Sequence, residues 1–280
     1  IEKLRRVQID DLLRRDPIKT DIQRIFDSLI GKTVMVTGAG GSIGSEICRQ
    51  VLRANPRKLI LLGHGENSIF EIDEELKYLR TSLEKTEIIP VICDIRMEER
   101  LDWVYKEYRP HVVFHAAAHK HVPLMEMHPA EAITNNVIGT YNSVNLAVTY
   151  KTSKFIMIST DKAVNPTNVM GASKRISEMI VLDAARKHNR AFSVVRFGNV
   201  LGSRGSVIHT FTKQIQRGGP VTVTHPNILR YFMTIPEAVQ LVLQAFILGR
   251  GCEIFVFDMG DPHLVANLAK DMISLSGLEI

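Results

Sequence analysis

Short apolar runs and helix-patterned segments alternate along residues 31–200. The strand-like runs are residues 32–38, 58–63, 87–94, 111–118, 154–160 and 191–200. Amphipathic patterns lie between them, at residues 45–55, 67–85, 97–108, 132–150 and 172–188. Continuous apolar strands separated by helices are typical of a parallel sheet that helices cover on both faces. The pattern therefore predicts an α/β fold with a Rossmann-type, doubly wound parallel sheet.

The glycine-rich segment TGAGGSIG stands between the first strand-like run and the first helical pattern. Gly38 suits a tight turn, Gly41 lets the backbone approach a pyrophosphate, and Gly44 allows the helix to pack closely on the sheet. Backbone amides at the start of the helix, from Ser42 and Ile43, would then hold the phosphates. A purely structural glycine turn is the alternative. A strand before the segment and a helix after it favour a dinucleotide, NAD or NADP.

Other candidate cofactor contacts follow the next strand-like runs. Glu66 is placed to bind the ribose 2′-hydroxyl of NAD, and no arginine follows at once, which favours NAD over NADP. Glu66 could instead cap a helix that begins with Asn67 and Ser68. Asp94, with Ile95 beside it, is placed at the adenine edge, and a helix N-cap is an equally open alternative for Asp94. Small residues that would let the nicotinamide ribose lie close follow the fourth run: Ala116, Ala117 and Ala118.

Four polar residues, Ser159, Thr160, Asp161 and Lys162, follow the run KFIMI. Because strand carboxyl ends line the ligand crevice of such sheets, we expect these residues to face the nicotinamide. Asp161 and Lys162 suit a reaction with two proton transfers besides hydride transfer; a turn with a solvated lysine is the alternative. Lys174 would hydrogen-bond the nicotinamide ribose and lower the pKa of a neighbouring hydroxyl. Taken alone, Lys174 would be interpreted as a solvent-facing helix lysine, but its four-residue offset from Met170, its place on this helix and the glycine-rich loop upstream favour the cofactor role.

Both ends of the chain depart from the alternation. Residues 1–30 carry apolar residues at helical spacing, interrupted at Pro17, which predicts two short amphipathic helices. We expect them to pack on the body or on a neighbouring subunit of a homo-oligomer. After residue 195 the connections are rich in glycine and proline. The predicted organisation is a helical segment at 1–30, an NAD(P)-binding domain at 31–195, and a smaller substrate-binding region at 196–280 that is interleaved with the core.

Composition narrows the class of protein. The net charge of +5 comes from 35 basic and 30 acidic residues spread along the chain, so it favours an anionic small substrate as much as a nucleic acid. Three distant cysteines, Cys48, Cys93 and Cys252, indicate reduced thiols and hence a cytoplasmic location. The sequence shows neither a signal peptide nor an apolar run long enough to span a bilayer. Because residue 1 is not methionine, we expect this chain to be a fragment.

These motifs resemble an extended short-chain dehydrogenase/reductase, and within it the bacterial UDP-N-acetylglucosamine 4,6-dehydratases of the polysaccharide-biosynthesis group. The segments that carry the resemblance are TGAGGSIGSE, HAAAHKHVPLME, NNVIGTYN, STDKAVNPTNVMGASKR, RFGNVLGSRGSVIHTF and RYFMTIPEAVQL. They cover nearly all of residues 31–241, and the segment from STDK to MGASK is the most discriminating. The group usually continues beyond a sequence like DMISLSGL, so the resemblance implies that the C-terminal region is truncated here.

The resemblance implies a reaction and the residues that perform it. A 4,6-dehydratase oxidises sugar C4, removes water across C5 and C6, and returns the hydride to C6, so the cofactor is regenerated. Lys162 would remove the C5 proton, Asp161 would protonate the departing C6 hydroxyl, and Thr160 would hydrogen-bond the C4 oxygen. The group that deprotonates the 4-hydroxyl stays open between Asp161 and Thr160 acting with water and Lys174.

Met170 occupies the position of the tyrosine in the Tyr-x-x-x-Lys motif of short-chain dehydrogenases, four residues before Lys174. The resemblance accounts for this change, because the membrane-anchored branch of the group carries methionine there. Met170 would then lie over the site without carrying a proton. The same branch implies transmembrane segments upstream of residue 1, which would place the domain on the cytoplasmic face of the inner membrane.

The substrate contacts that we expect are Lys120, Asn199, Arg204 and Arg230, of which the basic ones suit a diphosphate. His119 and His121 flank Lys120, but no carboxylate or cysteine has the spacing of a metal ligand beside them, so we predict no metal. The expected partner is a UDP-sugar, without nucleic acid.

Two other functions compete with the dehydratase. A nucleotide-sugar epimerase would need C4 oxidation and sugar rotation, but not the acid and base at Asp161 and Lys162. A non-catalytic dinucleotide-binding sensor is the second alternative, and Met170 is the residue that suggests it.

Overall fold

A computed structural model of the protein describes residues 20–80, 85–203 and 205–279. The chain divides into two compact units. Residues 20–197 and 239–257 belong to the larger unit, and the smaller one comprises residues 198–238 and the described residues after 257. The chain therefore leaves the larger unit after residue 197, returns to it, and leaves again after residue 257.

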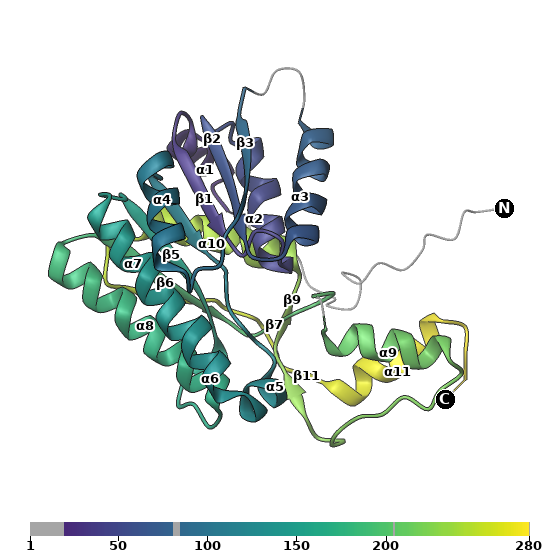
Figure 1. Ribbon diagram of the computed structural model, residues 1–280. Helices are drawn as coiled ribbons and strands as arrows, with labels where there is room; N and C mark the ends of the chain where they lie inside the picture. The colour runs from purple at the N-terminus through teal and green to yellow at the C-terminus, as the bar shows by residue number, and fades with distance from the viewer. Residues whose placement is uncertain (1–19, 81–84, 204, 280) are drawn as a thin grey trace. The chain divides into compact units, whose positions relative to one another are not determined.

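A seven-stranded parallel sheet forms the centre of the larger unit (Figure 1). Its strands, in order across the sheet, are β10 (Ile254–Val256), β6 (Ala191–Phe197), β5 (Lys154–Thr160), β4 (Val112–His115), β1 (Thr33–Thr37), β2 (Lys58–Gly63) and β3 (Glu87–Ile92). Every neighbouring pair is parallel. All five residues of β1 are buried, as expected for a central strand covered on both faces. The predicted Rossmann-type sheet is confirmed.

Helices α4 (Glu98–Tyr108), α7 (Gly139–Thr149) and α8 (Val169–His188) cover one face of the sheet (Figure 1). Their buried side chains, such as Val181, join strand residues such as Val113 in one apolar cluster. Helix α8 begins where the Asn168 side chain accepts a hydrogen bond from the Gly171 amide, and ends at Asn189, which has left-handed backbone angles. Both are signals that the sequence supplies locally.

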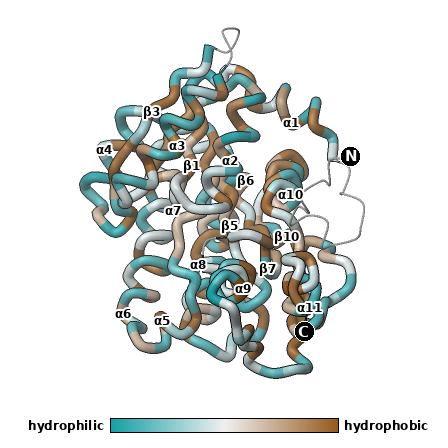
Figure 2. The backbone as a smooth tube through the Cα atoms, turned by 90° about the vertical axis from the view of Figure 1, so that its right-hand side faces the viewer, coloured by the Kyte–Doolittle hydropathy of each residue, from teal (hydrophilic) through white to brown (hydrophobic). Residues whose placement is uncertain are grey.

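Helices α2 (Ser42–Arg53) and α3 (Glu66–Leu79) pack against β1, β2 and β3 on the opposite face (Figure 1). Helix α10 (Ile235–Leu248) is hydrophobic over most of its length (Figure 2). Its Phe246 ring lies 5.7 Å from the ring of Phe114 in β4. An apolar helix of this kind is explained by burial of most of its surface.

Helix α1 (Ile22–Leu29) lies within the second of the two helices predicted near the N-terminus. Asp21 caps it by accepting a hydrogen bond from the Arg24 amide, and Ile25 and Leu29 are buried. The first predicted helix lies outside the described residues. Within residues 20–80, 85–203 and 205–279, no helix has both the length and the apolar character needed to cross a membrane.

The helix predicted at residues 132–150 is present, but its first part is not an α-helix. Residues Ala132–Ile138 form a π-helical turn, which continues into α7. The short helices α5 (Val122–Met127) and α6 (Pro129–Glu131) precede it. Periodicity indicates a helix but does not separate the π form from the α form. π-Helical turns are frequent at functional sites.

The strand predicted at residues 191–200 ends early, because β6 stops at Phe197 and the chain passes into the smaller unit. Asn199 and Val200 form the two-residue β7, which pairs with β9 (Phe232–Met233) in a separate sheet. The seventh strand of the large sheet, β10, was not predicted. It has only three residues, too few for a strand period to be recognised.

The smaller unit contains short strands and two helices. Its other elements are α9 (Val207–Gln216), β8 (Leu229–Arg230), β11 (His263–Leu264) and α11 (Val265–Leu275). Strands β8 and β11 are antiparallel. Two small apolar clusters stabilise this unit, one including Leu201 and Phe232 and the other including Phe211 and Val265.

Candidate active site at the ends of the parallel strands

The glycine-rich loop joins β1 to α2, at the point where the strand order of the sheet reverses. Gly38 has a left-handed φ of +69°, and a Cβ there would lie 2.8 Å from the amide nitrogen of Ala117. A Cβ on Gly44 would collide with the Gly38 carbonyl. Gly41 is exposed and occupies the N-cap of α2, where no side chain bonds the helix amides. This is the cradle that a pyrophosphate requires.

The residues predicted at the adenosine end follow β2 and β3, the two strands that come after β1 in the sheet order, and their local structure differs in part from the prediction. Glu66 is the first residue of α3, whose N-cap is Gly65, so the alternative in which Glu66 caps a helix beginning at Asn67 is wrong. Asp94 does not cap α4 either, because Met97 holds that position. Asp94 instead accepts hydrogen bonds from Arg96, at 2.9 Å from its amide and 2.7 Å from its guanidinium.

The Asp94–Arg96 pair belongs to a wider charged group. The Arg96 hydrogen bonds hold the pKa of Asp94 below its ordinary value. Arg96 also lies 3.0 Å from Glu131 at the end of α6. Ile95, between the two paired residues, is buried and would contact a Cβ placed on Gly139. The predicted adenine edge therefore combines the charged side chains of Asp94, Arg96 and Glu131 with the buried apolar side chain of Ile95.

The predicted acid and base meet at the carboxyl end of β5. Residues Asp161–Ala163 form a single 3₁₀ turn directly after the strand. Lys162 Nζ lies 3.0 Å from Asp161 Oδ1, and the Thr160 hydroxyl donates to the same oxygen at 2.8 Å. The side chains of Asp161 and Lys162 are 44% and 30% exposed. The three residues thus form one hydrogen-bonded group that ligand can reach.

Lys174 is buried, so the interpretation as a solvent-facing helix lysine is wrong. Its ammonium donates to the Ile158 carbonyl at 2.8 Å, just before the polar residues that follow β5. Burial lowers the pKa of Lys174 to about 8, and the negative charge of Glu178 opposes that effect. Lys174 is therefore held against the strand end that carries the candidate catalytic group.

Met170 is 3% exposed and packs in an apolar cluster with Met125 of α5 and Ala132. The position that carries tyrosine in many short-chain dehydrogenases is thus a packing position in this structure. One residue later, a Cβ on Gly171 would collide with the Lys162 carbonyl. The start of α8 therefore approaches the 3₁₀ turn closely.

Asn136 is a buried residue of this region that the sequence analysis did not single out. Its side chain accepts from the His119 amide at 2.8 Å and donates to the His119 carbonyl and to the Ser173 hydroxyl, both at 3.0 Å. It thereby connects the HKHVP loop to α8. Lys120 of that loop is exposed, although partial desolvation of its ammonium lowers its pKa. The π-helical turn brings the asparagine inward, and two consecutive asparagines in an apolar helical pattern were the available signal.

Two buried ionisable residues were also missed. His115, at the end of β4, hydrogen-bonds the hydroxyls of Thr37 at 2.8 Å and Thr140 at 3.0 Å. Burial, assisted by the charge of Lys174, lowers the pKa of His115 to about 3, so the ring is neutral. Glu178 of α8 is fully buried and bonds Ser159 and Arg196. Neither role follows from sequence, because the partners lie far along the chain.

The remaining predicted contacts belong to the smaller unit. Asn199 begins β7, and its amide donates to the Tyr231 carbonyl at 3.2 Å. Arg230 is exposed at the end of β8. Arg204 lies outside the described residues. Among the residues that the structure describes, no three His, Cys, Asp or Glu side chains gather in a group that could hold a metal ion.

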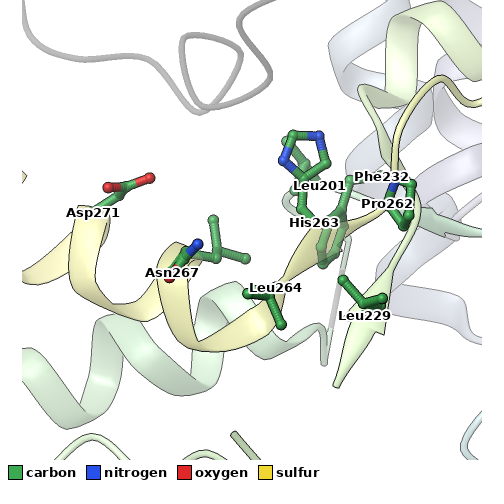
Figure 3. Close-up of a pocket in the computed structure, with 9 residues that line it drawn as sticks. Leu201, Leu229, Phe232, Pro262, His263, Leu264, Asn267 and Asp271 are labelled. Carbon is green, nitrogen blue, oxygen red and sulfur yellow. The ribbon is translucent and has the colours of Figure 1, made fainter. Parts of the chain in front are cut away.

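A pocket lies within the smaller unit, between α11 and the strands β8 and β11 (Figure 3). Asn267 and Asp271 of α11 and His263 of β11 are its polar residues, and the others are Leu201, Leu229, Phe232, Pro262, Leu264 and Leu268. None of the predicted site residues lines this pocket. The candidate chemistry is therefore in the larger unit, and not in this pocket.

Comparison with known proteins matches residues 34–280 to the family described as "Polysaccharide biosynthesis protein". The "Capsular polysaccharide biosynthesis protein CapD" of Staphylococcus aureus is 56% identical over 99% of this chain and 46% of its own length. A "UDP-glucose 4-epimerase" of Rickettsia prowazekii is 39% identical over 89% of this chain and 72% of its own. The chain thus spans about half the length of the Staphylococcus relative.

Solved structures share the fold. Pen from Bacillus thuringiensis has a TM-score of 0.83 and 33% identity, covering 90% of this chain and 76% of its own. DesIV of Streptomyces venezuelae, a dTDP-glucose 4,6-dehydratase with NAD bound, has a TM-score of 0.77 and 20% identity. It covers 88% of this chain and 81% of its own, and at this identity shows the fold alone.

Proposed function

The chain belongs to the polysaccharide biosynthesis protein family, and on that premise we propose that it is the catalytic domain of a nucleotide-sugar 4,6-dehydratase acting on UDP-N-acetylglucosamine. The observation that carries the proposal is the pair of Asp161 and Lys162, with 3.0 Å between its acid and base atoms at the carboxyl end of β5. An elimination needs both an acid and a base, whereas epimerisation at C4 needs neither at C5 and C6.

The glycine loop supports a bound NAD(P). Side chains at Gly38 and Gly44 would collide with the backbone, and the uncapped start of α2 presents amides to a pyrophosphate. Glu66 at the start of α3 favours NAD, since a carboxylate binds a ribose hydroxyl and repels a 2′-phosphate. When bound, the nicotinamide supplies hydride acceptance from sugar C4 and hydride return to C6. Ala116, Ala117 and Ala118 leave room for the nicotinamide ribose.

The protein's own residues handle the protons. The cycle starts from a neutral Lys162 amine that lies 3.0 Å from the Asp161 carboxylate, and the carboxylate becomes the neutral acid by taking up the sugar 4-hydroxyl proton as C4 is oxidised. Once C4 is a ketone, the C5 proton is acidic, and the Lys162 amine accepts it while Asp161 protonates the departing C6 hydroxyl as water. The pair then holds a lysine cation and a carboxylate. Lys162 returns its proton to C5 as hydride adds to C6, which restores the neutral amine and the carboxylate.

The 4-hydroxyl proton completes the balance. The Thr160 hydroxyl donates a hydrogen bond to the Asp161 carboxylate at 2.8 Å. It can therefore accept the proton of the sugar 4-hydroxyl while passing its own proton to that carboxylate. This proton replaces the one that leaves in water. Lys174 is not the primary acceptor in this scheme, because its ammonium is bonded to the Ile158 carbonyl. With the cofactor bound, it would supply positive charge to the nicotinamide ribose.

The predicted substrate contacts remain Lys120, Asn199, Arg204 and Arg230. The three basic side chains would supply cations for a diphosphate, and Asn199 would supply an amide. The anionic UDP-sugar is the partner that such a set would bind.

The competing function is a nucleotide-sugar epimerase, which the 39% identical Rickettsia relative favours by its name. The test is incubation of the complete protein with UDP-N-acetylglucosamine and NAD, followed by mass spectrometry and NMR of the product. Loss of one water supports the dehydratase. An unchanged mass with altered configuration at C4 supports the epimerase, and binding without any turnover supports a sensor.

A further inference from the structure

Two residues of α8, one turn apart, hold consecutive residues at the end of β5. Lys174 donates to the Ile158 carbonyl at 2.8 Å. Glu178 accepts from the Ser159 hydroxyl at 2.6 Å. The next residues along the chain are Thr160, Asp161 and Lys162, which form the candidate catalytic group. The position of that group is therefore set from α8.

Glu178 is also tied to the neighbouring strand. Arg196 of β6 lies opposite Ser159 in the sheet register. Its guanidinium bonds both carboxylate oxygens of Glu178, with Nε 2.8 Å from one of them. Arg175 adds a third cationic donor at 3.1 Å. The side chain of Glu178 is completely buried, and that of Arg196 is 11% exposed. Both carboxylate oxygens thus have partners, which a buried carboxylate requires.

Among the described residues, the charged and titratable groups that act on Lys174 or on Glu178 come from α8, β4 and β6. Glu178 lies on the same helix as Lys174, His115 on β4, and Arg196 on β6 beyond the carboxylate. His115 is neutral, because burial lowers its pKa to about 3. Glu178 is the group whose charge counters the desolvation of Lys174.

We infer that Glu178 is the positioning residue of the site: it fixes the end of β5 that carries Thr160, Asp161 and Lys162, and its buried carboxylate, one turn along α8 from the buried Lys174, supplies negative charge for that ammonium. The inference rests on the proposed function, and its two parts can be separated. The hydrogen bond to Ser159 performs the first task. The negative charge performs the second.

The positional part is tested with Ser159→Ala in the complete protein. This variant removes the hydroxyl that donates a hydrogen bond to Glu178, and it changes no charge. We expect kcat for water loss to fall roughly tenfold or more, since small displacements of catalytic groups are costly, with KM nearly unchanged. The alkaline limb of the pH profile should stay in place. A wild-type kcat would overturn this part.

The charge is tested with the double variant Glu178→Gln/Arg196→Met, because Glu178→Gln alone leaves a buried guanidinium poorly paired and could prevent folding. The readout is ¹³C NMR of lysine Cε, with the Lys174 signal assigned by Lys174→Met. We expect Lys174 to titrate at lower pH in the double variant than in the wild type. In Arg196→Met, which keeps the carboxylate and Arg175, it should not move to lower pH.

Asp183→Asn is the matched control, because this exposed carboxylate of α8 forms an ion pair with Lys187 at 2.8 Å. It should leave both kcat and the Lys174 titration unchanged. The NMR titration needs no turnover, so it distinguishes the outcomes. If the wild type never removes water, the proposed function fails while Lys174 still reports on Glu178. If Lys174 titrates identically in wild type and double variant, the inference about Glu178 is overturned.

Discussion

Asp161 and Lys162 are neighbours in sequence whose side chains turn toward each other, bringing Oδ1 and Nζ to 3.0 Å. Side chains of successive residues in a strand point to opposite faces. The 3₁₀ turn that follows β5 removes this constraint and lets acid and base share one site. A single substrate can therefore meet both groups at once.

Lys162→Met should stop removal of the C5 proton. In D₂O, the wild type is expected to place deuterium at C5 of the product, whereas this variant should return substrate without it. We expect kcat to fall about 10²- to 10⁴-fold, the usual contribution of a general base. Lys187→Met, which removes an exposed lysine of α8, should behave as wild type. Normal deuterium incorporation in Lys162→Met would assign the base elsewhere.

Asp161→Asn should stop both proton transfers that the carboxylate makes. The amide cannot take up the 4-hydroxyl proton that Thr160 passes on, and it cannot protonate the C6 hydroxyl. In D₂O we expect little dehydrated product and no deuterium at C5 of the recovered substrate, detected by mass spectrometry. Efficient loss of water by this variant would contradict the assignment of Asp161 as the acid.

Substitutions at Gly38 and Gly44 of the nucleotide loop, with Gly31 before β1 as the comparison, separate backbone strain from collision. Gly31→Ala meets only strain, since φ is +70° with no atom within 4 Å, and should cost about 1–2 kcal/mol in the free energy of unfolding. Gly44→Ala meets only a collision with the Gly38 carbonyl. Gly38→Ala meets both, with φ +69° and Ala117 at 2.8 Å.

Urea unfolding and NAD titration would measure these three variants. We expect Gly38→Ala to be the least stable, and both Gly38→Ala and Gly44→Ala to lose cofactor affinity, while Gly31→Ala binds normally. Equal affinity in all three would show that the loop does not hold the dinucleotide.

His115 should make the fold sensitive to acid. Its pKa is about 3 in the folded protein and about 6.5 when unfolded, so the unfolded state binds the extra proton between these values. Stability from the neutral ring is complete above about pH 6.5 and declines as the pH falls toward 3. The accumulated loss is on the order of a few kcal/mol.

His115→Gln removes this titration, so its free energy of unfolding should vary less between pH 6.5 and 4 than that of the wild type. Urea unfolding at each pH measures it, with the exposed His188→Gln as control. Parallel curves for wild type and His115→Gln would mean that the ring is protonated in the folded protein.

Met170→Leu should preserve turnover, because the side chain packs against Met125 and Ala132 and transfers no proton in the proposed scheme. A shape-conserving change of this kind costs less than about 1.5 kcal/mol. Met170→Tyr should instead lower the free energy of unfolding by about 1–3 kcal/mol through overpacking, without raising kcat. Turnover and urea unfolding would be measured for both variants. Loss of activity in Met170→Leu without loss of stability would show that the thioether has a direct role in the reaction.

The elements and residues that could be predicted from the sequence are those that a local pattern of residues encodes. The strands from Thr33 to Phe197 were found because buried parallel strands are continuous apolar runs, and Lys174 was placed by its spacing and context. The three-residue β10 and the π-helical turn carry no distinct period. The roles of His115 and Glu178 depend on Thr37, Ser159 and Arg196, whose proximity is a product of the sheet order rather than of any local motif.

The passage of the chain out of the sheet after β6 has a consequence for the order of folding. Strand β10, which pairs with β6, follows only after the long excursion through residues 198–238. Pairing over such a separation closes a large loop and is slow compared with local steps. During synthesis, β6 must keep one edge open until residues 254–256 have left the ribosome. During that interval the open edge of β6 can pair with a wrong strand.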